Sequence, residues 1–213
     1  MNKPIDYNTI GFVEGNVKEN NVISFLDKHA QKCPERTALK WVSRDNLKTW
    51  DGKGKLSHSS ITYKELAQKI SIVAYGLKQI GINKGDRIII FVPLSLELYL
   101  SMFAVQRIGA IAVFLDSWAR RDHLSVVARV VQPKSMISFQ DAFKLCENVA
   151  ELANIPLKIV VGSHEENYAT SLEELSAGKE ESEIEPVEGT DTALITFTTG
   201  SSCLLYTSPS PRD

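Results

Sequence analysis

The sequence has no apolar stretch long enough to cross a membrane, and its first ten residues lack the charged start and apolar core of a signal peptide. It also has no excess of basic charge: 24 Lys and Arg against 26 Asp and Glu give a net charge of −2, which argues against nucleic-acid binding. Cysteine is scarce, and Cys33 and Cys146 have no closely spaced partner. We therefore expect a cytoplasmic protein without disulfides or a transmembrane segment; peripheral contact with a membrane stays open.

Common nucleotide and metal motifs are missing too. The apolar run Arg87–Val92 is followed by P-L-S-L-E, where a Rossmann dehydrogenase would need G-x-G-x-x-G, and the sequence contains no G-x-x-x-x-G-K-[ST]. His58 and His164 have no ligand partner three or four residues away, and His29 has only Cys33 at that spacing. We therefore predict no metal site from the sequence.

What is present is an alternation of apolar strands and amphipathic helices from residue 87 onward. Continuous apolar strands that alternate with helices are typical of a parallel sheet covered on both faces. The predicted fold is therefore α/β: a doubly wound, mostly parallel sheet with helices on both faces. The predicted strands are 87–92, 110–115, 135–139, 157–161 and 192–197, and the predicted helices are 95–108, 120–131 and 141–153. Residues 162–190 are acidic and predict a solvated crossover with a short helix near 172–177.

The first eighty residues predict a helix, a hairpin and a second helix. Asn21 is a candidate cap for a helix to about Lys32, and residues 43–60 are polar, which indicates a hairpin with a long loop after a strand at 37–42. Thr62 and Glu65 have the spacing of a capping box, so the second helix should run from there to Ile80. The residues spaced to form one buried face of the first helix are Val22, Ile23, Phe25, Leu26 and His29.

A cluster of hydroxyls and one glycine follows the last predicted strand. Backbone N–H groups and hydroxyls in such a segment can converge on a phosphate, although a plain strand-to-turn segment has the same composition. The candidate phosphate-binding residues are Thr198, Thr199, Gly200, Ser201 and Ser202. No catalytic residue is assigned from the sequence.

This segment, T-F-T-T-G-S-S, resembles the phosphate-binding loop of the adenylate-forming (AMP-binding) enzymes, T-S/T-G-S/T-T/S-G-x-P-K-G. Residues 61–66 resemble the (L/I)-T-Y-x-E-L signature of the same family, residues 101–116 its helix–Gly-Ala–strand segment, and residues 22–39 its usual start. The resemblance covers about residues 21–202, and four weak motifs in register make it specific.

The end of the chain departs from the family pattern. Cys203, Leu205 and Tyr206 stand where the loop should have Gly, Pro and Lys. Written as codons, residues 203–213 resemble a transposase-type sequencing adapter; a native Ser/Pro-rich tail is the alternative. We expect residues 1–202 to be a partial N-terminal AMP-binding domain and residues 203–213 to be a non-native tail.

The resemblance implies an AMP-forming acyl-CoA synthetase that uses ATP, Mg²⁺ and CoA. The parent enzyme would activate a small-molecule carboxylic acid, by preference a fatty acid, as an acyl-adenylate and transfer the acyl group to CoA. In the family, most of the catalytic residues lie further along the chain, so we expect this chain alone to be inactive. Two alternatives are a non-catalytic nucleotide- or ligand-binding α/β module, and a fatty-acyl-AMP or β-lactone-forming relative that does not use CoA.

Overall fold

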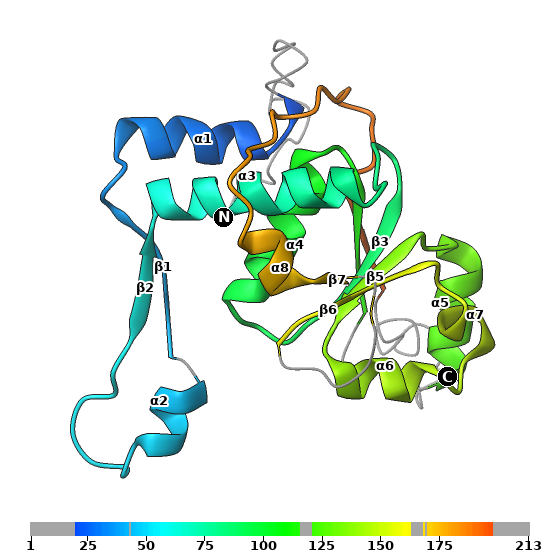
Figure 1. Cartoon of the computed structure of the whole chain (residues 1–213), viewed down its shortest axis with the longest axis horizontal. Helices are drawn as coiled ribbons and strands as arrows, with labels where there is room; N and C mark the ends of the chain where they lie inside the picture. Colours follow the sequence, from blue (N-terminus) through cyan, green and yellow to red (C-terminus); the bar gives the residue numbers. More distant parts are fainter. Residues whose placement is uncertain (1–19, 43, 116–120, 163–167, 169, 198–213) are drawn as a thin grey trace, which may run out of the picture.

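Six parallel strands form the central sheet, in the order β7-β6-β5-β3-β4-β8 (Figure 1). The computed structural model describes residues 20–42, 44–115, 121–162, 168 and 170–197. The sheet confirms the predicted fold class. Its strands are β3 (Arg87–Phe91), β4 (Ile111–Phe114), β5 (Ser135–Ser138), β6 (Leu157–Val160), β7 (Thr170–Ser171) and β8 (Leu194–Thr196).

Helices cover both faces of this sheet, so its strands are apolar on both sides. On β3, Ile88 and Ile90 pack into the cluster beneath the first helix layer, while Ile89 packs into the cluster beneath the second. The first layer holds α3 (Tyr63–Gln79), α4 (Leu96–Arg107) and α8 (Leu172–Ser176), with α1 (Ile23–Lys32) packed outside α3 and α4. The second layer holds α5 (Arg121–Val131), α6 (Gln140–Cys146) and α7 (Ala150–Ala153).

A hairpin projects from this body, as predicted for residues 37–60. Strands β1 (Thr37–Trp41) and β2 (Ser59–Thr62) pair antiparallel, and Figure 1 shows their loop extending away from the sheet. The loop contains a short helix, α2 (Arg44–Thr49), which the polar composition of the segment did not predict.

The capping box predicted at Thr62 and Glu65 is present, whereas Val22, and not the predicted Asn21, occupies the cap position of α1. Thr62 Oγ1 accepts a hydrogen bond from the Glu65 N–H at 3.2 Å, and Glu65 Oε2 accepts one from the Thr62 N–H at 2.9 Å. The Thr62 N–H and, after it, the Thr62 hydroxyl, which donates to Glu65 Oε2 at 2.9 Å, hold the pKa of the Glu65 carboxyl below its ordinary value. Gly81, at φ +90°, follows α3 in the left-handed conformation that glycine adopts without strain.

The predicted buried face of α1 is only partly right. Ile23 is buried and Leu26 packs against the core as predicted, whereas Val22 and Phe25 are 47% and 59% exposed. Ser24, which was not predicted, is buried. The reason is a tertiary contact before the helix: the buried Asn21 donates to the carbonyls of Gln106 and Glu185 and accepts from the Ile23 N–H. These bonds fix the rotation of α1 and override its apolar spacing.

The single helix predicted over residues 141–153 is also wrong, because the chain forms α6 and α7 with a turn between them. In the turn, the Val149 N–H donates to the Cys146 carbonyl at 2.9 Å. The side chains of Cys146 and Val149 lie in the same buried cluster. Asn148, a poor helix former, lies in the turn between the two helices.

The acidic crossover, here named the strap (residues 179–193), is docked on the first helix layer and is not simply solvated as predicted. Ser182 is 5% exposed. Its N–H donates to the Ser71 carbonyl at 3.1 Å, and its own carbonyl accepts from Ser71 Oγ at 3.0 Å and from Arg107 Nε at 2.8 Å. One serine of the strap is thus bonded to both α3 and α4.

Charged side chains hold the rest of the strap up to the start of β8. Lys78 Nζ lies 2.7 Å from Glu185 Oε2, and Lys84 Nζ lies 2.9 Å from Asp191 Oδ2. The second contact lowers the pKa of Asp191 and raises that of Lys84, since each group favours the charged form of the other. The strap therefore delivers β8 to the sheet along a fixed path.

Arg107 is the most buried charged residue of this path, and its removal should be costly. It is 6% exposed, and its guanidinium also binds both carboxylate oxygens of Asp27 at 3.0 and 3.1 Å. Arg107→Ala leaves that carboxylate and the Ser182 carbonyl without this partner, so the free energy of unfolding in urea should fall by about 2–4 kcal/mol. Arg129→Ala, which removes an arginine 64% exposed and 3.5 Å from Glu151, is the control and should cost about 0.5 kcal/mol. Equal losses in the two variants would contradict the proposed role of the strap contacts.

The capping box supports a second prediction. Thr62→Ala should lower the free energy of unfolding at neutral pH by about 1 kcal/mol, while Ser57→Ala in the exposed hairpin loop should change it by less than about 0.5 kcal/mol. A carboxyl with a lowered pKa stabilises the fold above its unfolded pKa, and this contribution is lost as the pH falls through its folded pKa. The difference between Thr62→Ala and the parent should therefore narrow in acid, and a difference that widens would argue against the box.

Candidate functional site

The sheet has a topological switch point between β3 and β4. The chain leaves β3 through α4, which lies in the first helix layer, and leaves β4 through α5, which lies in the second. The two crossovers depart to opposite faces, and ligands of open α/β sheets bind outside the carboxyl ends of the strands at such points. This edge of the sheet is the candidate site.

Strand β8 reaches the same edge beside β4. Phe114 of β4 pairs with Thr196 of β8, and Ile195 and Phe197 pack against the buried cluster of the second layer. The sequence continues from Phe197 directly into the candidate phosphate-binding segment. Those five candidates, Thr198, Thr199, Gly200, Ser201 and Ser202, lie outside the described residues, so their role stays a prediction.

On the other side of β3, a buried hydroxyl ties the carboxyl ends of two strands together. Ser138 Oγ, in a side chain with no exposed surface, donates to the Phe91 carbonyl at 2.6 Å. Ser138 was not predicted from the sequence. The available signal was its position directly after the apolar Met136 and Ile137, where a buried hydroxyl requires a partner.

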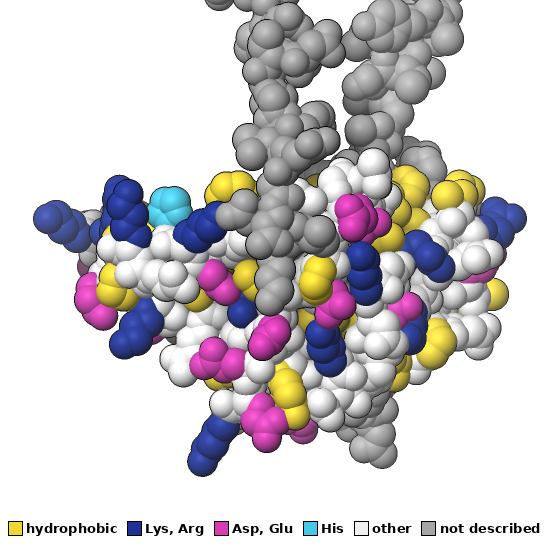
Figure 2. Space-filling view, turned by 90° about the horizontal axis from the view of Figure 1, so that it is seen from above, with side chains coloured by type: hydrophobic (Ala, Val, Ile, Leu, Met, Phe, Trp, Pro, Cys, Tyr) yellow, Lys and Arg dark blue, Asp and Glu magenta, His cyan; other side chains and the backbone are white. Residues whose placement is uncertain are grey.

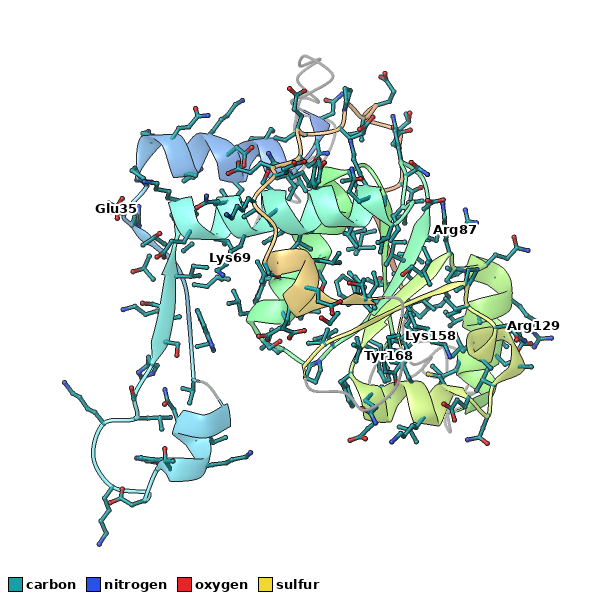
Figure 3. The ribbon with its side chains drawn as sticks, in the orientation of Figure 1. Glu35, Lys69, Arg87, Arg129, Lys158 and Tyr168 are labelled. Carbon is teal, nitrogen blue, oxygen red and sulfur yellow. The ribbon has the colours of Figure 1, made fainter. Side chains whose placement is uncertain are left out.

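Charged pairs gather at the opposite, amino edge of the sheet. Lys134 Nζ lies 2.7 Å from Asp86 Oδ2 just before β3, and the pair formed by Lys84 and Asp191 lies at the same edge. Figure 3 shows Arg87 at that end of β3, on the side away from the hairpin. These ion pairs fix the strands at their starts.

Aromatic and basic groups also meet on the second face. The rings of Phe143 and Tyr168 lie 5.1 Å apart, and Lys158 Nζ lies 5.9 Å from the Phe143 ring centre. Figure 3 shows Lys158 and Tyr168 next to each other beside the ends of the outer strands. Phe143 is 1% exposed, so its contacts with Tyr168 and Lys158 are part of the packing around the core.

Neither a metal-binding cluster nor a membrane span is present in the part of the chain that the structure describes. Within those residues, no three His, Cys, Asp or Glu side chains are grouped to hold a metal ion. No helix there is both long and apolar enough to cross a bilayer.

A family model described as AMP-binding enzyme matches residues 26–203. The match includes the docked strap, β8 and all five candidate phosphate-binding residues. It ends at Cys203, the first residue of the segment that resembles adapter sequence.

Curated relatives agree with this match over parts of the chain. An acetyl-coenzyme A synthetase of Thiobacillus denitrificans is 38% identical over 86 residues, which is 40% of this chain and 12% of the relative. One from Bradyrhizobium diazoefficiens is 28% identical over 163 residues, which is 73% of this chain and 24% of the relative. The chain thus spans no more than about a quarter of the length of these relatives.

A solved structure shares the fold. A long-chain-fatty-acid-CoA ligase from Archaeoglobus fulgidus matches with a TM-score of 0.68 at 20% identity, over 87% of this chain and 34% of the ligase. At this identity the similarity concerns the arrangement of strands and helices. Since the family model covers most of the chain and the sheet has the same arrangement, the chain belongs to the AMP-binding enzymes, the adenylate-forming family that its motifs predicted.

Proposed function

We propose that this chain is the N-terminal part of an AMP-forming acid–thiol ligase of the cytoplasm. Such an enzyme activates a carboxylic acid with ATP as an acyl-adenylate and passes the acyl group to CoA. The observation that carries the proposal is the position of β8: it lies beside β4 at the switch point and continues in sequence into T-T-G-S-S, inside the family match.

The chemistry of activation explains why this segment suits the task. The carboxylate attacks the α-phosphate of ATP and pyrophosphate leaves, so negative charge must be held on the β- and γ-phosphates. Hydroxyl and backbone N–H donors at fixed positions stabilise such charge without reorganising. We assign this contact to Thr198, Thr199, Gly200, Ser201 and Ser202, with Mg²⁺ as the accompanying cation of the nucleotide.

Two classes of acid fit the available similarities. The sequence of residues 101–110 and the long hairpin loop favour a fatty acid. The curated relatives at 28–38% identity are named acetyl-coenzyme A synthetases, which favours a short acid. The solved fatty-acid-CoA ligase does not decide between them because its 20% identity reports on the fold.

We also propose that the native family domain ends at residue 202 in this chain and that residues 203–213 are foreign to it. The family match stops at residue 203, where the loop pattern breaks. The parent enzyme would then continue after Ser202 with G-x-P-K-G and supply the remaining residues of the nucleotide and acid sites.

The first test concerns the chain itself. The purified 213-residue protein should show no acid-dependent exchange of pyrophosphate into ATP, because the family resemblance implies that most of the catalytic residues lie beyond residue 202. Exchange would be measured with acetate and with palmitate as the acid. Exchange above the acid-free control would show that the missing part is dispensable.

The second test uses the parent protein, with the coding sequence that follows Ser202 in an overlapping read. It should form acyl-CoA from one of the two acids, and the preferred acid decides its class. Thr199→Ala and Ser201→Ala should each lower kcat/KM for ATP by about tenfold to a hundredfold, the worth of a hydrogen bond to a charged group. Ser57→Ala in the hairpin loop is the matched control. A parent without G-x-P-K-G after Ser202, or unaffected by both variants, would contradict the proposed role.

A further inference from the structure

The end of the β1–β2 hairpin exposes two large apolar side chains. Leu47 is 59% exposed and Trp50 is 42% exposed. We name residues 44–58 the hairpin tip. Figure 1 shows the tip at the far end of the hairpin, away from the sheet and both helix layers. The body of the described chain therefore does not cover these two side chains.

The hairpin also carries a net positive charge. Residues 40–58 contain five Lys and Arg and two Asp, a net charge of +3 in a chain whose total is −2, so the remaining residues carry −5. The side chains of Lys48, Lys53 and Lys55 are exposed. Figure 3 shows nitrogen-tipped side chains spreading from this end of the hairpin.

The surface on the α1 side does not show the excess of positive charge found at the hairpin. Figure 2 views the molecule from the α1 side and shows acidic side chains interspersed with Lys and Arg. Several of those charges are paired at close range, as Lys78 is with Glu185. The hairpin tip thus combines unbalanced positive charge with exposed apolar groups, whereas the α1 side does not.

The tip is a built structure with its own hydrogen bonds. Trp50 Nε1 donates to the Lys53 carbonyl at 3.2 Å, the Lys53 N–H donates to Asp51 Oδ1 at 2.8 Å, and Asn46 Nδ2 donates to the Ser57 carbonyl at 3.2 Å. Because the indole N–H is already bonded, the exposed part of Trp50 is mainly its apolar ring. The tip therefore holds the Trp50 ring and the backbone at Lys53 in place, which reduces the conformational entropy that they lose on binding.

We propose that the hairpin tip docks on the surface of an anionic lipid bilayer. Tryptophan is favoured at the headgroup level of membranes, leucine gains by burial in the acyl boundary, and lysines are attracted to anionic headgroups. A soluble polyanion would use the lysines and leave Leu47 and Trp50 in water. A bilayer uses both kinds of side chain, which is why it fits this surface better.

The expected contact is weak and reversible. A lysine near an anionic surface strengthens binding about fivefold, so three lysines contribute about a hundredfold, and stable anchoring requires a second signal beyond charge. Here the second signal is the pair Leu47 and Trp50. The contact is independent of the proposed ligase chemistry, since neither ATP nor the carboxyl edge of the sheet takes part in it.

Co-sedimentation of the whole chain with vesicles tests the proposal. Vesicles of phosphatidylcholine with about 30% phosphatidylserine should bind the chain, pure phosphatidylcholine vesicles should bind it far less, and about 0.5 M NaCl should release it. The triple variant Lys48→Gln, Lys53→Gln, Lys55→Gln should lower the partition coefficient about a hundredfold, and Trp50→Ser about tenfold. Circular dichroism would confirm that the variants fold.

A matched control removes the same kinds of side chain elsewhere. Lys144 is exposed and Leu145 is 62% exposed, both on α6 in the second helix layer. The variant Lys144→Gln, Leu145→Ser should bind as the parent does. Trp50 should also report the contact directly: its emission should shift to shorter wavelength on anionic vesicles and be quenched by brominated lipid, and Trp50→Phe should abolish that shift.

Three outcomes would overturn the proposal. One is binding that does not distinguish anionic from neutral vesicles. Another is an equal loss in the α6 control, which would indicate general adhesion. The third combines two results: binding is lost in the lysine variant but not in Trp50→Ser or Leu47→Ser, and inorganic polyphosphate competes fully with the vesicles. Together these results would show that the tip binds soluble polyanions.

Discussion

The buried guanidinium of Arg107 is the contact on which the arrangement of the site depends. It lies at the end of α4, binds Asp27 of α1 through both carboxylate oxygens, and donates to the Ser182 carbonyl of the strap. Three segments that are distant in sequence thus converge on one cation. Because the strap leads into β8, this contact fixes where the last strand joins β4 and where the chain enters the candidate phosphate-binding segment.

Features set by neighbouring residues could be predicted from the sequence. The capping box at Thr62 and Glu65, the end of α3 before Gly81 and the continuous apolar strands each depend on groups a few residues apart. The parallel sheet followed from the alternation of those elements. The fold class and most element boundaries were therefore available before the structure.

Features set by distant residues could not be predicted. Ser71 and Ser182 are 111 residues apart, and only their pairing turns an acidic, loop-like sequence into a docked strap. The same holds for α1, whose rotation depends on bonds from Asn21 to carbonyls 85 and 164 residues away. The candidate site was named from a short motif, and the structure adds the switch point beside it but does not describe the five residues themselves.

The carboxyl edge of the sheet and the hairpin tip are physically separate, so a substitution in one should leave the other unchanged. The carboxyl edge of the sheet is positioned by buried contacts that run through α4 and the strap. The hairpin tip is held by hydrogen bonds among its own residues and joins the body only through β1 and β2. Substitutions at Lys53 or Trp50 therefore leave the path from Arg107 to β8 intact, so an effect on vesicle binding can be assigned to the tip without involving the nucleotide site.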